Sequence, residues 1–195
     1  MKTLETPFGF YSGTLNNNGL RIDGNKIKLT GAVSFDAGLP TALNFDVLDF
    51  IVLKEGAPSG EELSTTSGSF VETVDGYPLT FEYSLKSITD GTLNSLTSDG
   101  DLYTEITKTK IILNLKIYTI QTIPGVPTPI SIPIMNAQDV LISTQYYSKN
   151  IGLVYNKTDL NYTLNQIPAG FNITISFPSS GSQTQEEFLE TYLIN

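Results

Sequence analysis

The chain has 195 residues, 20 acidic and 11 basic side chains, a formal net charge of −9, and no Cys, His or Trp. The missing residue types exclude disulfide bonds, thiol nucleophiles, zinc sites built from Cys and His, and mechanisms in which imidazole transfers a proton. The acidic charge and the single arginine, Arg21, argue against nucleic acid or an anionic membrane surface as partner. The length predicts one domain over residues 1–195.

The beginning of the chain and its longest uncharged run both lack a membrane or export signal. Residues Met1 to Pro7 are too short and too polar for the apolar segment of a signal peptide. The run Ile117–Gln138 contains four prolines, so we expect no membrane-spanning segment. Two localisations remain open. The protein acts at the cell envelope or outside the cell if Met1 replaces a removed signal, and otherwise in a virion or the cytoplasm.

Alternating apolar and polar residues dominate the chain, a period typical of strands with one buried face. In chain order, the alternation covers residues 27–35, 79–85, 111–117 and 171–177. Asp23-Gly24 predicts a hairpin between residues 20–22 and 26–29, because such pairs adopt the positive φ of tight turns. Asp75-Gly76, Asp90-Gly91 and Asp99-Gly100 predict further turns.

One uninterrupted stretch, Leu102–Ile120, is much longer than a usual strand. A long strand favours an antiparallel barrel or a strongly curled sheet, and a sandwich stays open if a bulge near Lys108–Lys110 divides the stretch. The C-terminal part of the chain, 179–195, predicts a short helix that starts at Thr184, or else a mobile tail. We therefore expect an all-β domain of about ten strands with one short C-terminal helix.

Two groups of residues are the candidate ligand-binding residues. The proline-rich stretch 123–134 is apolar and extended, and Val126, Ile130 and Ile132 on it would contact a ligand or partner if exposed. Tyr and Phe are abundant, and aromatic side chains on a concave sheet suit a lipid or a sugar. Three tyrosines of the C-terminal half complete the prediction: Tyr146, Tyr147 and Tyr155.

Carboxylates are the only residues that can supply acid–base chemistry. Asp46 with Asp49 would point to opposite faces of a strand, and Asp99 with Asp101 belong to a turn, so neither pair predicts a glycosidase site. Asp99 and Asp101 offer oxygen ligands for calcium, but the spaced acids of an EF-hand are missing. We expect no catalytic residue, metal or cofactor.

A resemblance to bacterial envelope lipoproteins rests on about twenty residues. The segment Thr144–Tyr155 (TQYYSKNIGLVY) is similar to a hairpin near the end of many such proteins. The opening Gly9–Leu15 (GFYSGTL) resembles the first strand of lipocalin-like envelope domains. This resemblance implies a curled antiparallel sheet or barrel, and a lipid-attachment cysteine that was removed together with a signal.

Three functions follow as hypotheses. The first is a non-catalytic envelope or secreted domain that binds an apolar, lipid-like or cell-surface ligand, with a small molecule or a protein surface as partner. The second is a structural subunit of a virion, tube or filament, for which homo-oligomers are expected. The third is a carboxylate-dependent carbohydrate-active enzyme.

Overall fold

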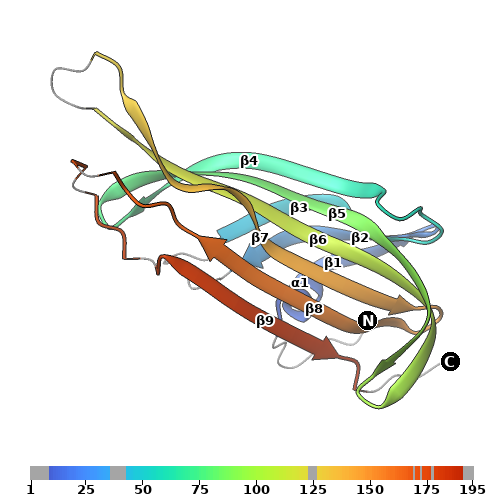
Figure 1. The fold of residues 1–195 in the computed structure, drawn as a ribbon. Coiled ribbons are helices and arrows are strands. Elements are labelled where there is room, and N and C mark those ends of the chain that lie inside the picture. Colours follow the sequence, from blue (N-terminus) through green and yellow to red (C-terminus); the bar gives the residue numbers. More distant parts are fainter. Residues whose placement is uncertain are drawn as a thin grey trace.

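The computed structural model describes residues 9–35, 43–122, 127–168, 170–171, 173–176 and 178–190. These residues form one short helix and nine strands (Figure 1). In chain order the elements are α1 Phe10–Asn17, β1 Gly19–Asp23, β2 Lys26–Phe35, β3 Leu43–Lys54, β4 Glu62–Val74, β5 Tyr77–Ser98, β6 Asp101–Gln121, β7 Ile130–Ser148, β8 Gly152–Thr163 and β9 Ser180–Phe188.

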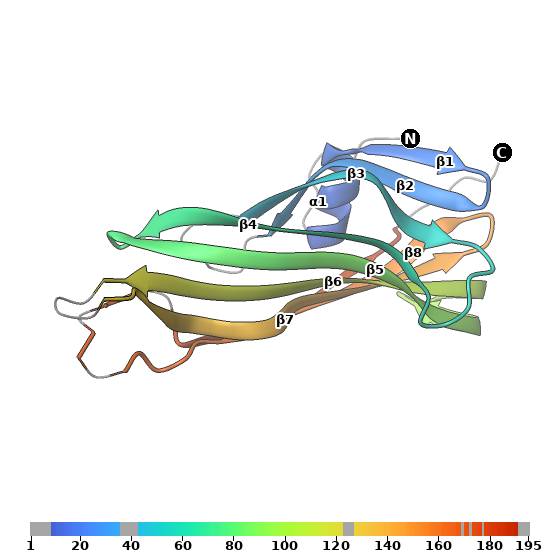
Figure 2. The same cartoon turned by 90° about the horizontal axis from the view of Figure 1, so that it is seen from above.

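The strands form two antiparallel sheets. The small sheet has the order β1-β2-β3, and the large sheet runs in chain order from β4 to β9. The small sheet and α1 lie over one face of the large sheet (Figure 2), which we call the inner face; the opposite face is the outer face. The apolar core fills the space between these layers and contains Leu29, Phe45, Phe81 and Leu113. The all-β prediction is therefore confirmed, with nine strands in the described part of the chain.

The expected barrel is wrong, because β4 and β9 are the two edges of the large sheet and do not pair. The edge at β4 meets the small sheet instead. The N–H of Ile51 on β3 donates to Ser64 Oγ on β4 at 2.9 Å, and Ser87 Oγ on β5 donates to the carbonyl of Ile51. These side-chain bonds hold β3 beside the edge that a closed barrel would need for β9.

The expected C-terminal helix from Thr184 is also wrong for the described residues, since Ser180–Phe188 form β9. The tail prediction fails for the same residues. Glu and Gln favour a helix locally, but pairing with β8 supplies backbone partners along the whole segment. Tertiary pairing outweighs a local helix preference of a few tenths of a kcal/mol per residue.

The one described helix lies at the other end of the chain. Residues Gly9–Leu15, expected as a first strand from the lipoprotein resemblance, contain the start of α1. Thr14 Oγ1 donates to the carbonyl of Phe10 at 2.8 Å within the helix. None of the described helical structure is long and apolar enough to cross a membrane.

Most predicted turns and strands are confirmed. Asp75-Gly76 and Asp99-Gly100 form the turns after β4 and β5 with positive φ, and Gly24 forms the turn of the first hairpin. Asp90-Gly91 lies inside β5, where it causes a register shift instead of a turn. Residues 171 and 173–176 are not a strand, although Ile173 is buried in the core.

The long uninterrupted stretch is confirmed as a single strand, β6. No bulge divides this strand near Lys108–Lys110: the register with β7 is continuous from Ile106 to Leu113, and the shift opposite Lys108, between Thr89 and Thr92, lies on β5. The register with β7 shifts at Asn114 instead. The sheet bends there without dividing the strand.

Candidate functional site

Two of the predicted tyrosines meet on the outer face. Tyr146 and Tyr155 are cross-strand neighbours on β7 and β8, with ring centroids 5.0 Å apart. Phe188 on β9 continues the row at 5.2 Å from Tyr155. Tyr155 donates a hydrogen bond to Glu186 Oε1 at 2.8 Å. Because the rings pack on one another, this row ties three strands together.

The other predicted ligand-binding residues lie elsewhere. Tyr147 points to the inner face, where its hydroxyl shares a hydrogen bond with that of Tyr11 on α1. Ile132 is 2% exposed and belongs to the core, and the partly buried Ile130 packs against this core. Val126 lies outside the described residues. The described part of the proline-rich stretch therefore contributes side chains to the core.

Sequence reasoning missed a row of polar residues that crosses the inner face. One residue from each of five strands lies in register in this row, which we call the polar band: Thr89, Thr109, Gln145, Asn156 and Glu187. Thr109 Oγ1 donates to Gln145 Oε1 at 3.1 Å, Gln145 Nε2 to Asn156 Oδ1 at 3.3 Å, and Asn156 Nδ2 to Glu187 Oε2 at 2.6 Å. The chain of bonds runs toward the carboxylate.

The polar band ends at the N-terminus of α1. The N–H groups of Tyr11 and Ser12 donate to the two oxygens of Glu187 at 3.2 and 3.0 Å, and the N–H of Phe10 donates to Gln185 Oε1 at 2.9 Å. These first-turn N–H groups have no partner within a helix, and the helix dipole favours a negative charge beside them. The band therefore fixes α1 against β9.

The buried tyrosines of this region stay neutral. Burial raises the pKa of Tyr11 well above its ordinary value, and Tyr147 and the charge of Glu187 add to the rise. Burial likewise raises the pKa of Tyr147, although hydrogen bonds with Tyr11 and Thr109 lower it in part. Two neutral hydroxyls at physiological pH can donate and accept hydrogen bonds, but they do not act as bases.

A hollow of about 330 Å³ opens on the large sheet where β7, β8 and β9 run side by side. We call it the β7–β9 hollow. It is lined mainly by small polar side chains: Gln138, Asp139, Asn161, Tyr162, Thr163, Ser180, Gly181 and Ser182.

The hollow exists because the β7–β8 ladder stops early. The last paired residues are Leu141 and Leu160. Beyond them the side-chain amide of Gln138, not the backbone of β7, bonds to the backbone of β8. Its Nε2 donates to the carbonyl of Thr163 at 2.8 Å, and its Oε1 accepts from the N–H of Thr163 at 3.1 Å. An amide side chain between the two backbones separates the strands and leaves space on the sheet.

Some of the polar groups that line the hollow already form hydrogen bonds within the protein. Ser182 Oγ donates to Asn161 Oδ1 at 2.7 Å, and Asn114 Nδ2 donates to Asp139 Oδ1 at 2.8 Å. Within the described residues, the amide N–H groups of Asn161 and the hydroxyls of Thr163 and Ser180 have no hydrogen-bond partner. All three side chains are exposed. Donors and acceptors thus remain available for a bound molecule.

Gly181 on β9 lines the hollow. A Cβ at this position would be 2.4 Å from Cε1 of Tyr162, whose ring turns inward to the core. Only glycine lets the two strands approach with that ring between them. In the sequence, only the polar residues around Asn161 and the Ser/Gly segment 179–182 mark this site, and neither pattern by itself indicates a binding site.

The carboxylates considered for catalysis or calcium do not gather. Asp49 pairs with Arg21 at 3.0 Å, while Asp46 and Asp101 are exposed. Asp99 forms the turn after β5 with a φ of 50°. No group of three acidic residues in the described part of the chain is placed to hold a metal ion.

No protein-family model matches the chain, and neither a curated protein nor a solved structure matches it significantly.

Proposed function

We propose that the protein is a non-catalytic binding domain for a hydroxyl-rich ligand, of the kind that carbohydrates at a cell surface present. The observation that carries this proposal is the β7–β9 hollow, where mostly uncharged polar side chains, some with uncommitted donors and acceptors, surround an open space. Hydroxyl-rich ligands are recognised by such placed amides and hydroxyls, because each buried ligand hydroxyl needs a partner.

Two features favour a polar ligand over the apolar one expected from the sequence. Ile132 already lies in the core, so an apolar ligand that used it would have to displace packed side chains. In the row of Tyr146, Tyr155 and Phe188, neighbouring rings already pack on one another. The hollow, by contrast, lies open on the sheet. A location at the cell envelope or outside the cell is part of this proposal.

The enzyme alternative receives less support. Hydrolysis of a glycosidic bond usually needs two carboxyl groups about 5–10 Å apart across the scissile bond. Asp139 is the single carboxylate among the residues that line the hollow, and Asn114 donates to it. We therefore propose binding without catalysis.

Binding can be tested by two-dimensional NMR titration with neutral hexasaccharides: β-1,4-glucan, α-1,4-glucan, β-1,4-xylan and chitin. We expect at least one of them to shift the amide signals of Asn161, Thr163 and Ser182. Asn161→Ala removes an uncommitted amide and should weaken binding about fivefold or more, because one hydrogen bond contributes about 1 kcal/mol. Asn94→Ala, at an exposed position on β5, is the matched control.

The proposal fails if none of the four sugars shifts those signals. It also fails if Asn94→Ala weakens binding as much as Asn161→Ala does.

A structural subunit of a larger assembly is the second candidate function. The observation that favours it is the edge of β9 that faces away from β8, which is paired with no other described strand.

A further inference from the structure

No described strand pairs with the edge of β9 that faces away from β8, which we call the free edge, and its backbone groups can be assigned. At the ends of its pairing with β8, the N–H of Leu189 donates to the carbonyl of Val154, and the N–H of Leu164 donates to that of Ser179. Hydrogen-bonded residues alternate along an antiparallel pair, so the odd-numbered residues of β9 bond to β8. The even-numbered residues direct their backbone N–H and C=O groups to the free edge: Ser180, Ser182, Thr184, Glu186 and Phe188.

This edge lacks several of the features that usually prevent strand pairing. Edge strands are normally kept short, interrupted by a bulge or proline, or marked with lysine. β1, the edge of the small sheet, is five residues long and carries Arg21, and β4 is covered in part by β3. β9 is nine residues long, is in continuous register with β8, and contains neither lysine nor proline.

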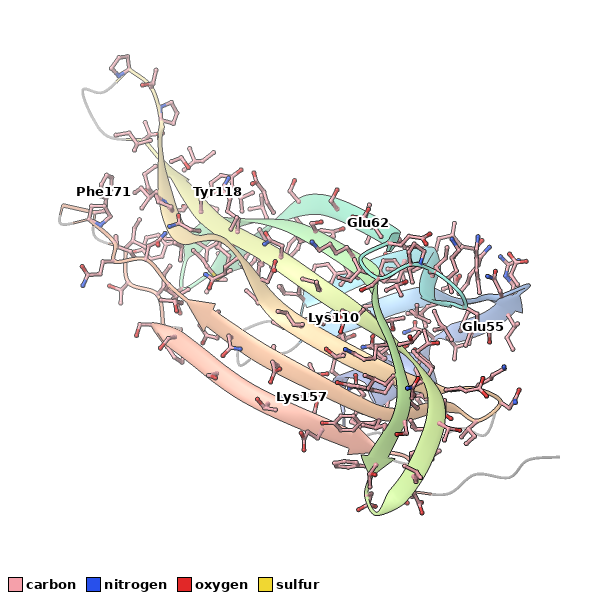
Figure 3. All side chains as sticks on the ribbon, turned by 45° about the vertical axis from the view of Figure 1, so that its right-hand side comes forward. Glu55, Glu62, Lys110, Tyr118, Lys157 and Phe171 are labelled. Carbon is pink, nitrogen blue, oxygen red and sulfur yellow. The ribbon has the colours of Figure 1, made fainter. Side chains whose placement is uncertain are left out.

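Both acidic residues of β9 accept hydrogen bonds within their own chain. Glu186 accepts a hydrogen bond from Tyr155 and lies opposite Lys157, which is on the outer face in Figure 3. Glu187 accepts N–H groups from the start of α1. Both carboxylates are therefore held by partners in their own chain and do not occupy the backbone groups of the free edge.

We propose that β9 pairs with β9 of a second copy of this chain, antiparallel and about a two-fold axis at Thr184. In this register Thr184 faces the partner's Thr184, Ser182 faces the partner's Glu186, and Ser180 faces the partner's Phe188. The two-fold axis repeats the last two pairs, so five pairs of edge-directed residues form about ten hydrogen bonds, two in each pair. An axis at Glu186 would place like charges opposite each other, which is unfavourable. Two-fold dimers are also the commonest homo-oligomers.

Light scattering after size-exclusion chromatography tests the dimer. The measured mass should rise with concentration from 21.3 kDa toward twice that value. Thr184→Pro removes an N–H that points to the free edge and none that bonds to β8, so it should give a monomer with an unchanged circular dichroism spectrum. Thr184→Ala keeps the N–H and should dimerise like the parent protein.

A disulfide trap tests the register. The chain has no cysteine, so a disulfide formed by Thr184→Cys must join two copies. Residues facing each other in a hydrogen-bonded pair have Cα atoms about 5.5 Å apart, within disulfide range. Mild oxidation should cross-link Thr184→Cys and leave Asn94→Cys mostly uncross-linked. A monomeric parent protein at every concentration, a dimer that survives Thr184→Pro, or equal cross-linking of both cysteine variants would overturn the proposal.

Discussion

The inner face of the large sheet has two regions of opposite chemistry. In the first, which we call the apolar region, Leu79, Phe81, Ile117 and Ile132 are almost completely buried. In the second, the polar band crosses from β5 to β9 and ends at α1. Apolar burial stabilises in proportion to area and tolerates small shifts, whereas a buried hydrogen bond requires one geometry. The comparison indicates that the apolar region holds the layers together and the polar band sets where α1 and β9 lie.

The largest effect is expected in the apolar region. Phe81 is 2% exposed, and its ring stacks on Phe70 with centroids 5.1 Å apart. Phe81→Ala leaves a cavity and should lower the free energy of unfolding by about 3–5 kcal/mol, measured by urea denaturation. Val71→Ala, at a position 63% exposed on β4, is the control and should change it by less than about 0.5 kcal/mol. Similar losses in the two variants would contradict the assignment of this core.

A smaller and more local effect is expected in the polar band. Asn156→Ala removes the donor to Glu187 and a partner of Gln145, both in a buried network. The free energy of unfolding should fall by about 2–3 kcal/mol, because partner groups are left unsatisfied. Hydrogen exchange should accelerate most at the Tyr11 and Ser12 amides, whose acceptor is Glu187.

Hydrogen exchange in the two variants would distinguish the role of the polar band from that of the apolar region. Phe81→Ala should raise exchange rates across the whole sheet, since it acts on global unfolding. Asn156→Ala should raise them first in α1. If exchange in α1 stays unchanged, the polar band does not position the helix.

The smallest effect is expected at the turn after β4. Asp75 Oδ2 accepts hydrogen bonds from the N–H and hydroxyl of Ser176 at 2.7 and 2.8 Å, and these bonds lower the pKa of Asp75. A carboxyl whose pKa is lower in the folded state stabilises it above the unfolded pKa, about 4, and this contribution disappears as the pH falls through the folded pKa. Asp75→Asn should therefore be less stable than the parent near pH 6.

The pH dependence provides the check. Urea denaturation at several pH values should show the two proteins converging below about pH 3. Asn tolerates the positive φ of 52° that Asp75 adopts, so the turn itself is preserved. A stability difference that is constant from pH 2 to pH 6 would show that the charge of Asp75 is not responsible.

Sequence patterns predicted the strands more reliably than the sites. Strict alternation placed Leu79, Phe81, Leu113 and Leu115 on the buried face, since the direction of a side chain in a strand follows from parity alone. The same rule explains why Tyr146 and Tyr155 meet while Tyr147 faces the core. The β7–β9 hollow was not predictable, because it depends on hydrogen bonds between the side-chain amide of Gln138 and the backbone of Thr163, which is 25 residues away.

The sequence by itself determined an all-β chain with tight Asp-Gly turns and one very long strand, because side-chain alternation and positive-φ turns are local properties. The tertiary structure decided whether the sheet closes, which end of the chain is helical, and where polar groups gather. Those outcomes depend on partners distant in the chain: Ile51 beside Ser64, β8 beside β9, and Glu187 at the start of α1. A residue 175 positions away can satisfy a backbone N–H, and no local pattern contains that information.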